Sequence, residues 1–221
     1  MNSRKFFLCT AFVLLTAGFV PLAFGLTLNL DSVVTGFTPV GTSPWLYADI
    51  EQIETNKVSL TMFATNLAAG SGQFVSNWYF NVDSPNVSLV VASLNPTEQQ
   101  QLSSFSFSPD QAGEGQGLIS GFDLGFSFNT ANNEQGVNRF DAGEIFSADL
   151  LGTGLTPDSF FVTNADGSLY SAAHVQGING ELSGKIAQTS GAKPVPEPTT
   201  MLLLGIGLTG LAYFARKKFL K

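Results

Sequence analysis

The stretch "GFDLGFSFN", residues 121–129, decides the fold class. Apolar residues alternate along it with small or polar ones: Phe122, Leu124, Phe126 and Phe128 form the first set, and Gly121, Asp123, Gly125 and Ser127 the second. Successive side chains of a β-strand point to opposite faces of a sheet. The alternation therefore predicts a strand with one buried and one exposed face.

The same period of two recurs elsewhere, in "KVSLTMFATNL" (57–67), "FVSNWYFNVD" (74–83) and "SSFSFSPD" (103–110). Both faces of 74–83 are partly apolar, which favours a central strand. Clusters of Gly, Pro, Asn and Asp separate these runs and are typical of tight turns. The segment 96–104, "PTEQQQLSS", fits either one helical turn or a polar loop. We therefore expect an all-β fold, an antiparallel β-sandwich of jelly-roll-like form.

Residues 1–25 have the layout of a cleavable signal peptide. A basic pair at positions 4 and 5 precedes an uncharged, largely apolar segment that ends at Pro21. Ala23 and Gly25 are small residues at the two positions that a signal peptidase reads, so we expect cleavage after Gly25. An uncleaved membrane helix is the alternative, although the apolar segment is shorter than the ~20 residues that a span needs.

The charge of the exported part limits its partners. Between Leu26 and Lys193 there are four basic and sixteen acidic residues, which gives a net charge of −12. Such a surface repels the phosphates of nucleic acids, so we expect no nucleic acid partner. Solubility outside the cell explains the charge, and attraction of divalent cations is the alternative.

We expect a single extracytoplasmic domain over residues 26–184. The only cysteine, Cys9, lies in the signal segment, so the domain has no disulfide, no thiolate metal site and no cysteine nucleophile. Residues 185–195 are small, polar and partly Pro-rich, and we predict a flexible linker there.

A membrane-spanning tail is expected next. The seventeen residues from Thr199 to Ala215 carry no charge, and as a helix they reach about 26 Å, close to the ~30 Å hydrocarbon core of a bilayer. Arg216, Lys217 and Lys218 follow and should remain cytoplasmic by the positive-inside rule. Together with an N-terminal signal, this basic tip predicts that the domain lies outside the membrane.

The segment "VPEPTTMLLLGIGLTGLAYFARKK" (195–218) resembles the PEP-CTERM sorting signal of bacterial surface and matrix proteins. That signal joins a Pro-Glu-Pro motif, a transmembrane helix and a basic tip. The matching parts here lie within residues 196–221: the motif Pro196, Glu197 and Pro198, the helix at about 199–215, and the tip from Arg216.

The resemblance implies processing by an exosortase-type membrane protease. The helix would hold the motif at the outer boundary of the inner membrane, and helix and tip would then be removed. It also implies a Gram-negative bacterium that makes exopolysaccharide and forms a biofilm. An ordinary tail anchor with a chance Pro-Glu-Pro is the alternative. The domain is similar to β-rich bodies found on many such proteins, a similarity that implies no activity.

Few residues of the domain suggest chemistry. His174, the only histidine, lies in a predicted strand and is expected to be structural, since one histidine makes no multi-His zinc site and the sequence has no G-x-S-x-G nucleophile elbow. The stretch 129–144 is rich in oxygen donors suited to calcium: Asn129, Asn132, Asn133, Glu134, Asn138, Asp141 and Glu144. The spacing of a calcium loop is missing, so a polar loop with an Arg139–Asp141 surface pair is the alternative.

The sequence is compatible with carbohydrate binding as well as with a purely structural domain. A sugar-binding module needs aromatic platforms and polar amides, and the candidate platforms are Trp45, Tyr47, Trp78, Tyr79 and Tyr170. We expect Trp45 and Trp78 to be core residues instead. A glycosidase would need two carboxylates facing each other across a cleft. Because the domain has sixteen acidic residues, some pair of carboxylates is bound to occur, and its presence is weak evidence for a glycosidase.

The sequence thus predicts an exported protein of the cell surface or exopolysaccharide matrix, transiently anchored in the inner membrane and then sorted by an exosortase. We expect a non-catalytic structural or adhesive role without a cofactor. The expected partners are signal peptidase, the exosortase, the membrane before processing, and exopolysaccharide. A carbohydrate-binding β-sandwich module of the extracellular matrix is the alternative function.

Overall fold

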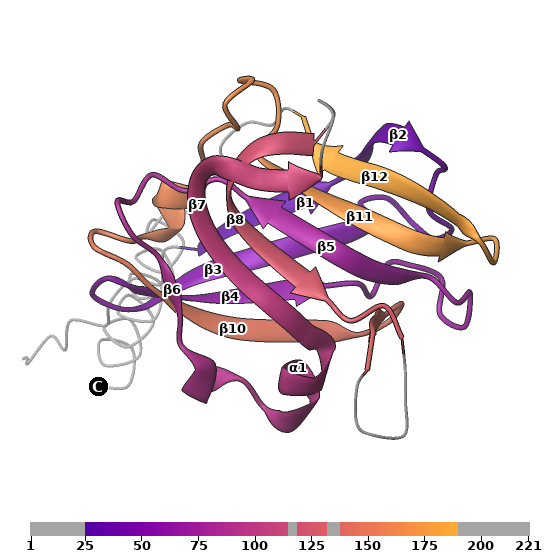
Figure 1. Cartoon of the computed structure of the whole chain (residues 1–221), viewed down its shortest axis with the longest axis horizontal. Coiled ribbons are helices and arrows are strands. Elements are labelled where there is room, and N and C mark those ends of the chain that lie inside the picture. Colours follow the sequence, from indigo (N-terminus) through magenta and orange to yellow (C-terminus); the bar gives the residue numbers. More distant parts are fainter. Residues whose placement is uncertain (1–24, 115–118, 132–137, 190–221) are drawn as a thin grey trace, which may run out of the picture.

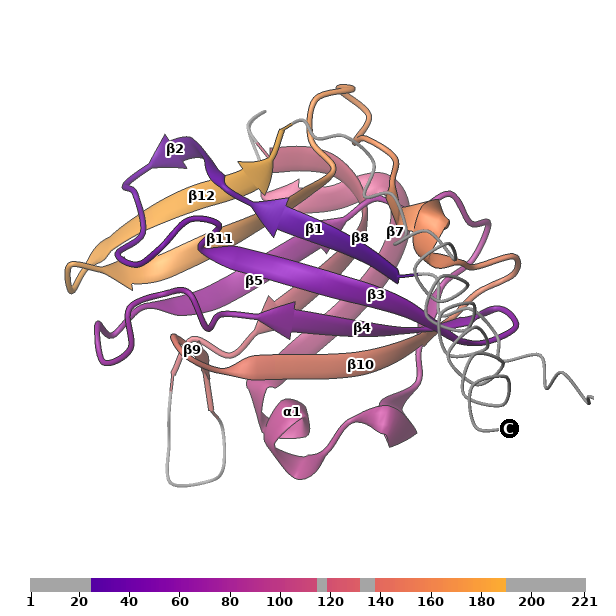
Figure 2. The same ribbon diagram turned by 180° about the vertical axis from the view of Figure 1, so that it is seen from behind.

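A computed structural model describes residues 25–114, 119–131 and 138–189 of the chain. Antiparallel β-strands dominate this part and form two sheets that lie face to face (Figures 1 and 2). The expectation of an all-β, antiparallel fold is therefore confirmed. The predicted signal peptide and C-terminal helix lie outside the described residues, except for Gly25, with which the first strand begins.

The first sheet has the strand order β1-β3-β4-β10-β6. Its strands are β1 (Gly25–Leu30), β3 (Leu46–Glu54), β4 (Lys57–Phe63), β10 (Ile145–Leu151) and the short β6 (Ser88–Leu89). Residues of β4 are alternately buried and half-buried, as the period of two in 57–67 predicts.

The second sheet has the order β2-β12-β11-β5-β8-β7. Its strands are β2 (Ser32–Gly36), β12 (Leu182–Gln188), β11 (Ser171–Ile178), β5 (Phe74–Phe80), β8 (Ile119–Phe128) and β7 (Leu102–Glu114), and β9 (Phe140–Asp141) pairs with β5. The predicted central strand is β5, which lies between β11 and β8 and is buried on both faces.

Aromatic side chains fill the space between the sheets. Phe126 of β8 makes edge-to-face contacts with Phe80, Phe105 and Phe146, with ring centroids 6.0, 5.0 and 6.1 Å away. Phe146 belongs to the first sheet and the other three rings to the second. The apolar face predicted from 121–129 is thus the contact between the two layers.

Phe122 departs from that prediction. Trp78 and Phe80 point into the main core, so Tyr79 between them points to the opposite face of the sheet. Phe122 stacks on Tyr79, with ring centroids 5.8 Å apart, and both belong to a second apolar cluster. The register between β7 and β8 shifts next to Phe122, and such irregularities redirect side chains.

The segment between β6 and β7 covers the outer edge of β10. It contains the turns η1 (Val91–Ser93) and α1 (Pro96–Gln101), so the helical alternative for 96–104 is the correct one for its first six residues. Asn95 and Glu98 cap α1 reciprocally: Asn95 Oδ1 accepts from Glu98 N at 3.0 Å, and Glu98 Oε2 accepts from Asn95 N at 2.7 Å. A local capping box therefore fixes the start of this short helix.

The expected start of the linker is wrong by four residues, because β12 continues to Gln188. Ile186 and Ala187 are fully buried, and β12 pairs with β11 on one side and β2 on the other. Packing on both faces thus overrides the small, polar composition that suggested a linker. Gln188 is also tied to the N-terminal strand, since its Oε1 accepts from Asn29 N at 2.9 Å.

Candidate functional site

The expected sorting and cleavage residues lie outside the described part of the chain: Ala23, Pro196, Glu197, Pro198, Arg216, Lys217 and Lys218. Within the described residues, no helix is both long and apolar enough to cross a membrane.

The candidate sugar platforms are mostly occupied by other contacts. Trp78 is fully buried and its Nε1 donates to Ser171 Oγ at 3.0 Å, so the core assignment is confirmed. Tyr79 is 5% exposed, and Trp45 is partly buried against the core.

Tyr47 lies on the outer face of the first sheet, directly opposite Phe63 on the neighbouring strand. The two ring centroids are 4.4 Å apart and the ring planes differ by 6°. Because neighbouring strands lie ~4.8 Å apart, such rings stand side by side and cover each other's faces. Tyr170 is stacked in a similar way on Phe161 at 4.6 Å. In each pair, one face of each ring is therefore covered by its partner.

His174 lies in the middle of β11, between β5 and β12. Its side chain is half-buried, and its backbone carbonyl accepts from Ser76 Oγ at 3.3 Å. The surroundings are those of a strand residue within a sheet, as the sequence predicts.

The oxygen-rich stretch 129–144 is described only in part, and Asn132, Asn133 and Glu134 lie outside the description. The Arg139–Asp141 pair is confirmed, with Nε 3.0 Å from Oδ1. Glu144 Oε2 accepts from Asp141 N at 2.7 Å and from Gln101 Nε2 at 2.8 Å. Among the described residues, no group of three or more His, Cys, Asp or Glu side chains is placed to hold a metal ion.

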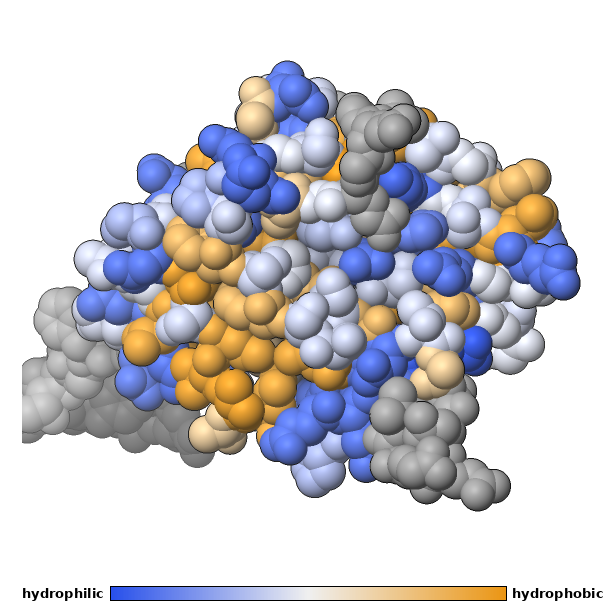
Figure 3. All heavy atoms as spheres, in the orientation of Figure 1, coloured by the Kyte–Doolittle hydropathy of each residue, from blue (hydrophilic) through white to orange (hydrophobic). Residues whose placement is uncertain are grey.

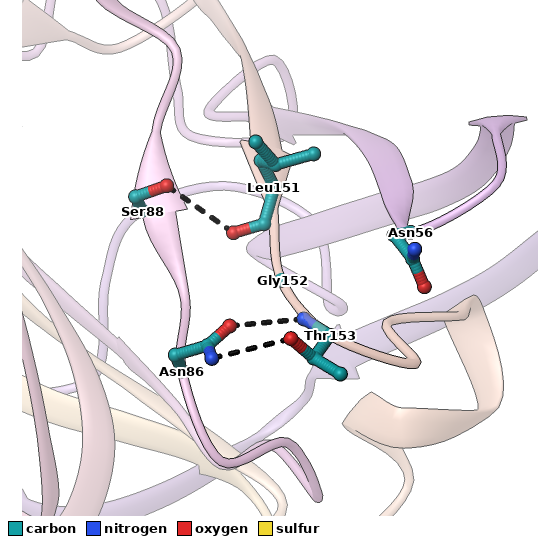
Figure 4. A pocket seen from close by; sticks show the side chains of 6 residues that line it. All are labelled: Asn56, Asn86, Ser88, Leu151, Gly152 and Thr153. Carbon is teal, nitrogen blue, oxygen red and sulfur yellow. Dashed lines mark hydrogen bonds between the residues drawn. The ribbon is translucent and has the colours of Figure 1, made fainter.

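A polar cleft of about 270 Å³ lies where three connections meet at one end of the sandwich (Figure 4). Asn56 comes from the turn between β3 and β4, and Asn86 and Ser88 from the entry to β6. Leu151, Gly152 and Thr153 come from the end of β10 and the turn after it. None of these side chains is charged.

Hydrogen bonds hold the walls of this cleft in place. Asn86 Oδ1 accepts from Thr153 N at 2.9 Å, while Asn86 Nδ2 donates to Thr153 Oγ1 at 3.2 Å. On the other wall, Asn56 Oδ1 accepts from Gly154 N at 2.8 Å. Asn56 has a φ of +65°, a left-handed conformation that asparagine tolerates better than most residues. Both asparagines therefore fix loop backbone through their side-chain oxygens.

Gly152 is required by the close approach of two of these connections. A Cβ atom at this position would lie 2.3 Å from the backbone oxygen of Asn86. The residues that line the cleft come from three separated stretches of the sequence, and only the fold brings them together. No local motif in the sequence identifies the cleft.

An apolar patch lies on another part of the surface, between β7 and the connection from β6 to α1 (Figure 3). The connection contains Val91, which is 63% exposed, and β7 contains Phe105 and Phe107, which are partly buried against the main core. Since β7 is the end strand of its sheet among the described strands, this patch borders a strand edge.

Comparison with known proteins identifies the tail and leaves the domain unmatched. The family model for the PEP-CTERM protein-sorting motif matches residues 194–218. No curated protein matches the chain, and no solved structure matches it.

Proposed function

We propose, from the PEP-CTERM protein-sorting motif that this chain carries at residues 194–218, that it is a non-catalytic structural or adhesive protein of the cell surface or exopolysaccharide matrix. The motif implies export and processing by exosortase, a membrane protein. Signal peptidase removes residues 1–25, the helix at 199–215 anchors the chain in the inner membrane, and exosortase then cuts near Pro196-Glu197-Pro198.

The apolar patch supports the adhesive part of this proposal. Exposed apolar patches rimmed by polar residues are typical of contact surfaces, and this patch lies beside a strand edge to which further β-structure can add. The net charge of −12 keeps the domain soluble outside the cell.

Mass spectrometry of protein extracted from the cell surface tests the sorting step. We expect an N-terminus at Leu26 and loss of the segment that ends at Lys221. Replacing Pro196, Glu197 and Pro198 by alanine should leave an intact C-terminus in the membrane fraction. The matched control is Lys193→Ala, three residues before the motif, which should be processed normally. Surface protein that still ends at Lys221 in a strain with active exosortase would refute the proposal.

The carbohydrate-binding alternative is favoured by one observation, the uncharged polar cleft, rather than by the aromatic residues. Amides and hydroxyls are the groups that recognise sugar hydroxyls, and they line this cleft from three connections. This alternative is compatible with the same sorting route, because it concerns only what the domain contacts after processing.

A further inference from the structure

We propose that the cleft between Asn56 and Asn86 binds one uncharged sugar unit of a glycan. This inference rests on the carbohydrate-binding form of the proposed function and names its site and ligand class. The first reason is the hydrogen-bonding capacity that the cleft walls retain. Each asparagine uses its side-chain oxygen on a backbone N–H, at 2.8 Å for Asn56 and 2.9 Å for Asn86.

The amide nitrogens of these residues are consequently oriented by the loops and keep donor capacity. A side-chain amide has two N–H donors, and Asn86 Nδ2 uses one of them on Thr153 Oγ1. Ser88 Oγ donates to Leu151 O at 3.3 Å, which leaves its lone pairs as acceptors. Donors and acceptors at fixed positions suit a ligand whose hydroxyls can do both.

The shape and the apolar part of the cleft indicate a ring-sized ligand. Its volume of about 270 Å³ is slightly below the ~300 Å³ at which pockets for drug-sized molecules begin. Leu151 is 47% exposed and lines the cleft between Asn56 on one side and Ser88 on the other (Figure 4). A pyranose has both a C–H face for Leu151 and hydroxyls for the amides.

The charges around the cleft favour an uncharged sugar unit over a uronic acid. Among the described residues, Lys57 lies beside the cleft as the pairing partner of Leu151 on β4, and its Nζ lies 3.0 Å from Asp149 Oδ2. The positive charge of Lys57 is balanced by Asp149, and the domain as a whole carries a net charge of −12. An anionic sugar therefore meets net repulsion at this site.

The test uses processed protein recovered from the cell surface and titrates it with neutral hexasaccharides of glucose, mannose and galactose, and with hexagalacturonate. Saturation-transfer NMR and calorimetry measure binding. We expect at least one neutral oligosaccharide to bind and hexagalacturonate to bind at least about tenfold more weakly. Binding of none of the neutral probes, or stronger binding of hexagalacturonate, overturns the inference.

Two variants place the binding site. Asn56→Asp with Asn86→Asp keeps both loop-fixing acceptors and replaces the donors by carboxylate oxygens, and should weaken binding at least about tenfold. Its control is Asn179→Asp, an exposed asparagine with a φ of +49° in the β11–β12 turn. Leu151→Lys removes the large apolar side chain of the lining, and Ile145→Lys is its control at the other end of β10, where Ile145 is 49% exposed.

Undiminished binding in both cleft variants overturns the site assignment, and thermal unfolding of each variant verifies that it is folded. The mass-spectrometric result distinguishes a failure of glycan binding from a failure of sorting. A correctly processed surface protein that binds no neutral glycan contradicts this inference and leaves the structural role standing. An unprocessed C-terminus contradicts the proposed sorting regardless of glycan binding.

Discussion

Glu98 of α1 and Ser147 of β10 are joined by a hydrogen bond of 3.0 Å from the Ser147 backbone N–H to Glu98 Oε1. Next to it, Ser93 Oγ accepts from Asp149 N at 2.9 Å. Strand β6 pairs only with Leu150 and Leu151 of β10. Side chains of the following segment thus bind backbone N–H groups of β10 beyond that pairing, which protects this part of the edge from other chains.

Glu98→Gln should destabilise the domain by about 1–3 kcal/mol. Both carboxylate oxygens of Glu98 accept from backbone N–H groups, whereas glutamine offers only one acceptor and turns an NH₂ group toward the other donor. Urea unfolding measures the difference. Glu51→Gln, an exposed residue on the outer face of β3, is the control and should change the free energy of unfolding little. Equal stability of the two variants would contradict the role assigned to Glu98.

Phe126→Ala should cost about 3–5 kcal/mol of unfolding free energy. Phe126 is fully buried and contacts aromatic rings of both sheets, so its loss leaves a cavity where the layers meet. Phe37→Ala removes the same atoms from a side chain that is 51% exposed, and should change stability by less than about 1 kcal/mol. Similar losses for the two variants would show that Phe126 is not central to the core.

Gly177→Ala should be more destabilising than Gly70→Ala, by about 1–3 kcal/mol. Both glycines have a φ of +73°, so alanine is strained equally at the two positions. A Cβ at Gly177 would lie 2.3 Å from the Gly72 backbone oxygen, whereas nothing lies within 4 Å of one at Gly70. Denaturant unfolding of the two variants separates the effect of the steric contact from that of the backbone strain. An equal loss of unfolding free energy in both variants would contradict the steric contact at Gly177.

Alkaline pH should remove the contribution of the Lys57–Asp149 pair. The hydrogen bond to Asp149 raises the pKa of Lys57 above its ordinary value of 10.5. A raised folded-state pKa means that the contribution is complete below the ordinary value and is lost as the pH rises through the folded value. The stability difference between wild type and Lys57→Met should therefore be constant from neutral pH to pH 10.5 and shrink above it. A difference that grows with alkaline pH would be the opposite of this expectation.

Much of the fold could be predicted from the sequence because its signals are local. The alternation in 57–67 and 74–83 requires only that one or both faces be buried, and the strands β4 and β5 satisfy it. Asn95 and Glu98 have the spacing of a capping box, which marks the helical alternative for 96–104.

The remaining features depend on residues distant in sequence. The cluster into which Phe122 packs depends on the register shift between β7 and β8, and the residues next to Phe122 in the sequence do not predict that shift. The end of β12 depends on pairing with β2, some 150 residues earlier in the chain. The cleft needs Asn56, Asn86 and Thr153 together, and each alone has the composition of an ordinary turn.

The position of β12 determines how the domain bears a mechanical load. The chain leaves the described domain from β12, which lies inside its sheet between β2 and β11 and not at an edge. A pull along this strand acts at right angles to the hydrogen bonds of two antiparallel ladders at once. Those bonds must shear together before the strand slides, whereas a terminal strand at an edge could be peeled off one bond at a time. The position of β12 thus favours resistance to a pull on the chain that follows Gln188.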